Sequence, residues 1–144
     1  MYLVKFVKLR EGAHIPCRAH DDDAGFDLYA SEDVSLKAHG FASVPTAISV
    51  ELPAGTEGQV RPRSGLAAKY GVTVLNAPGT IDAGYRGEVK VILINHGETD
   101  FEISAGMRIA QLMVKPVYPT EFVEVSSLAD SVRGEGGFGS SGTR

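Results

Sequence analysis

The sequence predicts an all-β domain, a sandwich or barrel of short antiparallel strands with one short helix. Helical periodicity is nearly absent, whereas short apolar or alternating runs recur, and each ends at Gly, Pro, Asn or Asp. Many short strands between frequent turn signals are typical of antiparallel sandwiches and barrels. The chain has 144 residues, 43% of them hydrophobic, which suits one compact domain with a real core.

The expected strands follow one another at short intervals. Residues 91–94 read Val-Ile-Leu-Ile and are apolar on both faces of their strand, so we expect a second sheet or another subunit to cover both sides. The N-terminal run lacks a signal-peptide cleavage pattern, and no segment approaches the length of a membrane span. The expected strands span residues 3–9, 26–30, 41–44, 47–52, 56–63, 72–75, 89–95, 101–103, 108–114 and 122–125.

One short helix is expected, with Ser64 as its cap and Gly71 at its end, because the residues between them favour helix. Residues 126–131 could add a second helical turn. Residues 133–142 hold five glycines and cannot build a core, so alone they predict a mobile tail. We therefore expect a barrel domain over residues 1–132 and a flexible arm over residues 133–144.

Composition excludes several classes of function. The net charge of -4, with no dense run of Lys or Arg, argues against coating a nucleic acid, although a few placed cations can still hold a nucleotide. Cys17 is the single cysteine, cannot form an internal disulfide and suits a reducing cytoplasm; we expect it to be a small, partly buried side chain. No zinc site is expected, because the histidines lack metal-ligand spacing: His14, His20, His39 and His96.

Two segments carry candidate chemistry at turns. In residues 79–88, glycines flank Asp82 and Tyr85, which suggests a tight hairpin with both side chains at its tip and Asp82 positioned as a general base. From composition alone, an ordinary turn, where Asp and Gly are common, is the better explanation. In residues 61–65, Ser64 at a helix start and Arg63 beside it suit a phosphate. A plain helix cap with a solvated Arg is the even alternative.

Three further residues need an explanation. Asp27 lies between Phe26 and Leu28 in an apolar stretch, where it can help hold hydrated magnesium or can be a buried, hydrogen-bonded Asp. Gln111 interrupts an apolar strand, either as a phosphate contact or as an outward-facing position. Phe138 is the one aromatic of the glycine-rich tail, and its ring can stack on a base for about 1–3 kcal/mol. In a solvated tail this ring would have no use.

Taken together, five segments resemble the homotrimeric dUTPase family in order and spacing: residues 24–28, 62–65, 79–87, 108–111 and 133–142. The resemblance spans nearly the whole chain, and five motifs in order are highly specific. One departure is minor, since Ser141 stands where the family often has Thr and keeps the hydroxyl. The resemblance implies a jelly-roll-like distorted β-barrel assembled as a homotrimer, with each active site built from all three subunits.

The resemblance also implies a role for each site residue. Asp82 would activate the attacking water, Asp27 would help place Mg²⁺ through water, and Tyr85 would leave no room for a 2′-hydroxyl. The phosphate contacts would come from Arg63, Ser64, Gly65 and Gln111. The base pocket would be formed by Asn76, Gly79, Thr80, Ile81 and Lys90. The arm would supply Arg133, Phe138, Gly139, Ser140 and Ser141.

The implied activity is Mg²⁺-dependent hydrolysis of dUTP to dUMP and pyrophosphate, which limits uracil incorporation into DNA and supplies dUMP for dTMP synthesis. The implied partners are dUTP and two further copies of the chain, with no nucleic acid and no membrane. Two alternatives remain: a dCTP deaminase on the same fold, whose family uses a Glu as base, and a non-enzymatic regulator. Asp82 in its motif and the complete tail with Phe138 favour the dUTPase.

Overall fold

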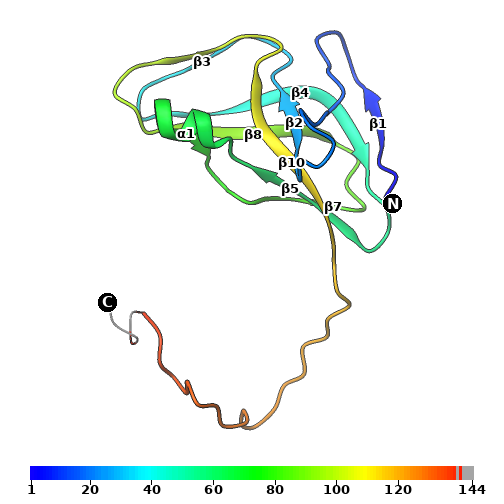
Figure 1. The fold of residues 1–144 in the computed structure, drawn as a ribbon, viewed down its shortest axis with the longest axis vertical. Coiled ribbons are helices and arrows are strands. Elements are labelled where there is room, and N and C mark those ends of the chain that lie inside the picture. The colour runs from blue at the N-terminus through cyan, green and yellow to red at the C-terminus, as the bar shows by residue number, and fades with distance from the viewer. Residues whose placement is uncertain (139, 141–144) are drawn as a thin grey trace.

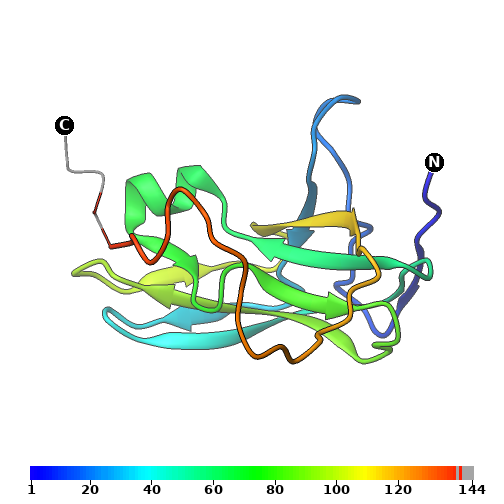
Figure 2. The ribbon, with the colours of Figure 1, turned by 90° about the horizontal axis from the view of Figure 1, so that it is seen from below.

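The computed structural model describes residues 1–138 and 140, and two four-stranded antiparallel sheets dominate it. The sheets lie one above the other (Figures 1 and 2). The first sheet has the order β1 (Lys5–Lys8), β4 (Phe41–Glu51), β8 (Glu88–Asn95), β6 (Val72–Val74). The second has the order β2 (Phe26–Tyr29), β10 (Arg108–Pro116), β5 (Thr56–Arg61), β7 (Gly79–Asp82). A third pair joins β3 (Val34–Leu36) to β9 (Phe101–Ile103).

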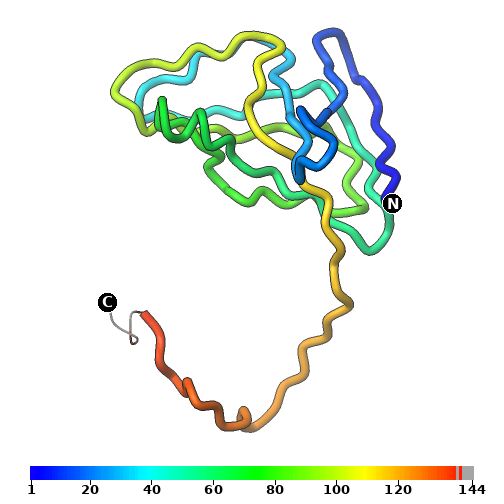
Figure 3. The backbone as a smooth tube through the Cα atoms, viewed as in Figure 1, coloured from blue at the N-terminus to red at the C-terminus, as the bar shows by residue number. Residues whose placement is uncertain are grey.

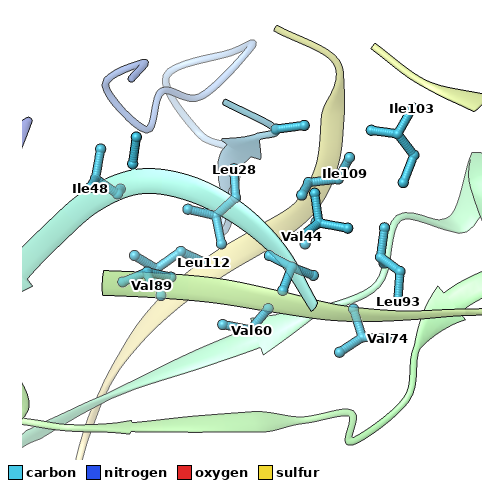
Figure 4. Close-up of a cluster of buried hydrophobic side chains, with 14 of the residues drawn as sticks. Leu28, Val44, Ile48, Val60, Val74, Val89, Leu93, Ile103, Ile109 and Leu112 are labelled. Carbon is cyan, nitrogen blue, oxygen red and sulfur yellow. The ribbon is translucent and has the colours of Figure 1, made fainter. Parts of the chain in front are cut away.

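The core lies between the two sheets and follows the two-residue period of their strands. In β8, Val89, Val91 and Leu93 are buried, while the intervening side chains are exposed or half-buried. Leu28, Val60, Ile109 and Leu112 come from the opposite sheet into the same cluster (Figure 4). The outward face of residues 91–94 is therefore only partly covered within one chain, and its cover by another subunit stays a prediction.

The strand β4 joins two expected strands into one. Ala47 lies in its middle with φ of 56°, in the left-handed region, and is completely buried. The pairing of β4 with β8 shifts register between Pro45 and Ser49, so the strand carries a bulge there. The bulge explains why the sequence pattern breaks between residues 44 and 47. The short strand β3 was missed, because three residues with one buried side chain, Leu36, give too little alternation.

The expected hairpin at residues 79–88 is wrong. β7 pairs with β5, from Val60 opposite Gly79 to Glu57 opposite Asp82, and β8 lies in the other sheet. β6 pairs with β8 only at residues 93–95, yet β7 does not add to the remaining edge of β8, because its buried residues Gly79 and Ile81 pair with β5 of the second sheet. The segment between β7 and β8 is instead a turn that crosses from one sheet to the other.

The helix α1 (Ser64–Tyr70) forms where expected, but Ser64 is not its cap. Arg63 occupies the cap position with an extended backbone, and no side chain caps the helix. Because the extended Arg63, directly after Pro62, takes the cap position, the helix begins at Ser64, one residue earlier than a Ser64 cap would place it. Gly71 ends the helix as predicted, in the left-handed conformation with φ of 68°. No helix in the described part of the chain has the length and apolar character needed to cross a membrane.

Beyond β10, the chain leaves the sheets (Figures 1 and 3). The described residues after Pro116 form no strand or helix, so the strand expected at 122–125 and the helical turn expected at 126–131 are wrong. Their apolar side chains find no surface on their own chain, which removes the packing that would fix secondary structure. The exposed apolar side chains of this segment include Val117, Tyr118, Phe122, Val123, Val125 and Leu128.

Candidate active site

A cavity of about 430 Å³ lies beside the turn that carries the chain from β7 to β8. It receives side chains from both sheets, because β7 supplies one wall and β8 the other. Seven of the residues that the sequence singled out line it: Asn76, Gly79, Thr80, Ile81, Asp82, Tyr85 and Lys90. The remaining lining residues are Ser43, Val60, Glu88, Val89 and Ile92.

Asp82 is the last residue of β7 and its side chain is exposed. The alternation of β7 explains this, since Gly79 and Ile81 are buried while Thr80 and Asp82 face outward. The Tyr85 amide donates to the Asp82 carbonyl at 3.0 Å and closes a turn directly after the strand. Asp82 is therefore a carboxylate held at the end of a paired strand and open to water, which is the placement a general base needs.

Tyr85 folds back over the turn that carries it. Its hydroxyl donates to the Glu88 carbonyl at 3.0 Å. A Cβ at Gly87 would lie 2.4 Å from the Tyr85 hydroxyl oxygen, so only glycine leaves room for the ring in this position. On the opposite wall, a Cβ at Gly79 would lie 3.2 Å from the Asn76 amide nitrogen. Two glycines thus let polar side chains approach the backbone closely around the cavity.

A second group of predicted residues gathers on β2, β10 and the start of α1. Asp27 is 6% exposed, and its Oδ2 lies 3.3 Å from Nη1 of Arg108. Its Oδ1 lies 3.4 Å from Nε of Arg63, which is an ion pair without hydrogen-bond geometry, so Oδ1 has no hydrogen-bond partner among the described residues. Arg63 also donates to the Arg108 carbonyl at 3.2 Å. Gln111 pairs with Asp27 across the sheet.

Arg108 is the residue of this group to which the sequence assigned no role. It opens the motif at residues 108–111, and that position was the available signal. Its guanidinium is about half exposed and shares the Asp27 carboxylate with Arg63. The two cations therefore lie together at the end of α1 where Ser64 and Gly65 begin the helix. Clustered guanidiniums of this kind can bind phosphate oxygens in pairs.

Close to this group, Cys17 makes an unexpected contact. Its Sγ lies 2.8 Å from the Tyr29 hydroxyl, and its carbonyl accepts the Asp27 amide at 2.7 Å. The hydrogen bond to Cys17, helped by partial burial, raises the pKa of Tyr29 to about 12. Cys17 itself is exposed rather than partly buried, because the loop before β2 leaves its side chain at the surface.

One chain does not bring the two groups and the arm into one cavity. The lining of the cavity contains none of Asp27, Arg63, Ser64, Gly65 and Gln111. Arg133, Phe138 and Ser140 are exposed on the segment that leaves the sheets (Figure 3), and Gly139 and Ser141 lie outside the described residues. Across residues 1–138 and 140, no three His, Cys, Asp or Glu side chains cluster closely enough to hold a metal ion by themselves.

The fold and these groups define a β-sheet protein with the parts for binding a polar, anionic small molecule. A family model described as dUTPase matches residues 11–142. A deoxyuridine 5′-triphosphate nucleotidohydrolase of Clostridium tetani is 55% identical over 141 residues, which make up 98% of this chain and 97% of that protein. A protein of the same name from Crocosphaera subtropica is 54% identical over 139 residues, 96% of this chain and 98% of the relative.

Solved structures agree with the sequence relatives. A mutant dUTPase of Staphylococcus bacteriophage 80alpha, determined with dUpNHpp, matches with a TM-score of 0.91 and 29% identity. The match covers 97% of this chain and 98% of that chain. A mutant dUTPase of phage phi11 matches with a TM-score of 0.80 and 26% identity, over 87% of this chain and 97% of that chain. The chain belongs to the dUTPase family.

Proposed function

We propose that this protein hydrolyses dUTP to dUMP and pyrophosphate. The observation that carries the proposal is the cavity beside Asp82, which gathers an amide, a tyrosine and a solvent-exposed carboxylate from separate elements. The relatives from Clostridium tetani and Crocosphaera subtropica carry the name of this activity, and the phage 80alpha dUTPase was determined with dUpNHpp. The full-length similarity to these relatives supports the same substrate here.

The cavity has the groups needed to select deoxyuridine. The Asn76 amide offers both a donor and an acceptor, and the backbone from Gly79 to Ile81 and at Lys90 offers further ones. A pocket built to pair with uracil leaves unpaired groups when cytosine occupies it, and that mismatch is costly. Tyr85 beside this pocket would pack under the sugar and exclude a 2′-hydroxyl. The base and sugar of dUTP are thus both selected in one cavity.

Asp82 would take the proton of the water that attacks the α-phosphorus. The new bond forms between the water oxygen and this phosphorus, the bond to the bridging oxygen breaks, and pyrophosphate leaves. Such a displacement depends on positioning and on neutralising charge more than on covalent catalysis. A positioned base contributes roughly 10²–10⁴-fold. The exposure of Asp82 at a rigid strand end supports this role.

Arg63, Ser64, Gly65 and Gln111 would bind the phosphates, and Arg108 joins them through its shared contact with Asp27. Mg²⁺ prefers one or two carboxylates together with substrate phosphates, and Oδ1 of Asp27, which accepts no hydrogen bond from the described residues, fits the protein's share of such a site. When bound, Mg²⁺ would neutralise charge on the triphosphate, with Asp27 holding it through water. The phage phi11 structure concerns the coordination of a structural Mg(II) ion, which supports metal binding in the family.

We further propose that three copies form a homotrimer of jelly-roll-like barrels and complete each site together. The proposed phosphate-binding residues around Arg63 lie apart from the cavity on one chain, and this separation supports a shared site because a nucleotide needs both. The outward face of the first sheet supports it as well, since Phe41 is 68% exposed opposite the half-buried Ile94. The segment after Pro116 carries its exposed apolar side chains away from its own chain and would place residues 133–144 as an arm over a neighbour's site.

A pyrophosphate-release assay tests the activity. With Mg²⁺, we expect turnover of dUTP far above that of dTTP, dCTP and UTP, and little turnover of any of them after chelation. The Asp82→Asn variant serves as the catalytic control. Ammonia release from dCTP would instead identify a deaminase, and nucleotide binding without any product would identify a non-enzymatic regulator. Either result would overturn the proposed function.

A further inference from the structure

A second acidic residue, Glu88, lines the cavity beside Asp82, and the contacts of its carboxylate differ from those of a catalytic group. Glu88 accepts two hydrogen bonds at the same oxygen, from Nη2 of Arg10 and from the backbone amide of Ala47, each at 2.8 Å. Its side chain is 16% exposed, whereas Asp82 is open to solvent. One oxygen of this carboxylate already accepts hydrogen bonds from Arg10 and Ala47. Glu88 is therefore placed to hold neighbouring groups in position and not to act as a general base.

The amide that Glu88 satisfies belongs to the bulge of β4. Ala47 is fully buried in the left-handed conformation, so its N–H points out of the regular strand ladder and needs a partner. The hydrogen bond from Arg10 is the largest cause that lowers the pKa of Glu88; partial burial opposes it, and the Ala47 amide adds to the lowering. A single oxygen of the charged Glu88 carboxylate therefore satisfies the buried Ala47 amide and neutralises the Arg10 guanidinium.

Two further side chains of the bulge bind the same stretch of chain. The Thr46 hydroxyl donates to the Val89 carbonyl, and the Ser49 hydroxyl donates to the Arg86 carbonyl at 2.6 Å. Together with the hydrogen bond between Ala47 and Glu88, they attach residues 86–89 to β4 by three hydrogen bonds. Leu9 donates its amide to the Ala47 carbonyl at 2.9 Å, which brings Arg10 to the same place. The N-terminal segment thereby supports the turn between β7 and β8.

The position of Tyr85 depends on the course of this stretch. Its hydroxyl binds the Glu88 carbonyl, and its ring lies against Gly87, where a Cβ would meet the ring at 2.6 Å. A movement of residues 86–88 would therefore carry the ring with it. Thus a change at Glu88 that moves this stretch also moves the ring that lines the cavity.

We propose that Glu88, bridging Arg10 and the Ala47 amide, is a positioning residue that holds Tyr85 in place and so sets the preference for a deoxyribose over a ribose. That the ligand carries a deoxyribose rests on the proposed function, whereas the positioning of Tyr85 rests on the contacts described above. Glu88 touches the backbone and Arg10, and it acts on the sugar only through Tyr85.

Three variants separate the contributions of Glu88. Glu88→Met keeps the length of the side chain and removes the acceptor for Ala47; Glu88→Gln keeps an acceptor without the charge; Arg10→Met removes the guanidinium alone. Glu51→Met is the matched control, because Glu51 pairs with Lys5 at the surface of the same strand β4. The ratio of kcat/KM for dUTP to that for UTP is measured for each, together with the thermal midpoint.

We expect Glu88→Met to lower this ratio by about tenfold, because small misplacements of a selecting group cost rates of that order. Glu88→Gln should restore most of it, Arg10→Met should lower it by about threefold or less, and Glu51→Met should leave it unchanged. A ratio within twofold of the original in Glu88→Met, with only a lower thermal midpoint, would reduce Glu88 to a structural role and overturn the inference.

Hydrogen exchange gives a readout that does not depend on turnover. In the ligand-free protein, amides of residues 84–89 and of Ala47 should exchange faster in Glu88→Met than in Glu88→Gln or Glu51→Met. If the unaltered protein releases no pyrophosphate from dUTP, the proposed function fails, and the exchange data still judge the positioning of the turn. Unchanged exchange at residues 84–89 in Glu88→Met would overturn the inference even in an active dUTPase.

Discussion

Gly87→Ala should damage sugar selection while the fold persists. The added Cβ would lie 2.4 Å from the Tyr85 hydroxyl oxygen, and ordinary contact begins at 3.4 Å, so the hydroxyl must move by about 1 Å. The clash also reaches ring atoms of Tyr85 at 2.6 and 2.9 Å, so rotating the hydroxyl alone cannot relieve it. A misplacement of about 1 Å can cost up to roughly 10²-fold in rate. We therefore expect a loss of ten- to a hundredfold in kcat/KM for dUTP, with less loss for UTP.

Gly84→Ala is the control for this change, because it adds the same methyl group in the same turn. A Cβ at Gly84 meets nothing within 4 Å among the described residues, and its φ lies outside the left-handed region. Steady-state kinetics with dUTP and UTP, with far-ultraviolet circular dichroism to check the fold, measures both variants. If Gly87→Ala keeps the selectivity of Gly84→Ala, then Tyr85 is not positioned by close contact with Gly87, and the reasoning is refuted.

Three further predictions concern the base, the core and pH. Asp82→Asn should lose roughly 10²–10⁴-fold in turnover and still bind dUpNHpp in calorimetry; turnover within tenfold would exclude Asp82 as the base. Leu93→Ala, at a position 1% exposed between the sheets, should lower the free energy of unfolding by about 2–5 kcal/mol in urea at fixed protein concentration; a loss below about 1 kcal/mol would contradict the assigned core. The contacts of Glu88, above all the hydrogen bond from Arg10, lower its pKa below 4.5 in the folded protein. The charged form therefore stabilises the fold above pH 4.5, and this contribution is lost as the pH falls through the folded pKa. The stability gap between the unaltered protein and Glu88→Gln should therefore shrink below pH 4.5, and a constant gap from pH 7 to about pH 3 would contradict this assignment.

The strand pattern was predictable where alternation is long enough to see. The core strands β5 and β8 follow the two-residue period, and the end of α1 follows from Gly71. The bulge at Ala47 and the pairing of β7 were not predictable, because both depend on which strands become neighbours when the sheets assemble. Alternation cannot report this, since it specifies a face and not a neighbour.

The candidate site was predictable to a similar degree. Motif order identified Asp82, Tyr85 and Asn76, which the structure brings to one cavity. The contact of Asp27 with two guanidiniums was not predictable, because Arg63 and Arg108 are far apart in sequence and meet only through the pairing of β2 with β10 and the start of α1. The role of Glu88 was hidden for the same reason, since its partners Arg10 and Ala47 come from other strands or loops.

A shared active site predicts complementation between two inactive variants. The cavity, the proposed phosphate-binding residues around Arg63 and the arm are separate on one chain, and we propose that a complete site combines parts from different copies. The first variant is Asp82→Asn with an intact arm, and the second keeps Asp82 but ends after Ser131. If Asp82 and the arm come from different copies, neither homotrimer has a complete site, whereas mixed trimers combine Asp82 of the second variant with an arm of the first.

The recovered activity can be calculated. With equal random mixing in a closed trimer, the copy that supplies Asp82 and the copy that supplies the arm are each intact with a chance of one half, so about one quarter of sites are complete. Co-refolded variants should then approach that fraction of the unaltered activity, with mixed trimers verified by differential tags. If the arm instead closed over the Asp82 of its own chain, no mixed trimer would contain a complete site. Verified mixed trimers without activity above that of the separate variants would therefore refute the exchange of arms between copies.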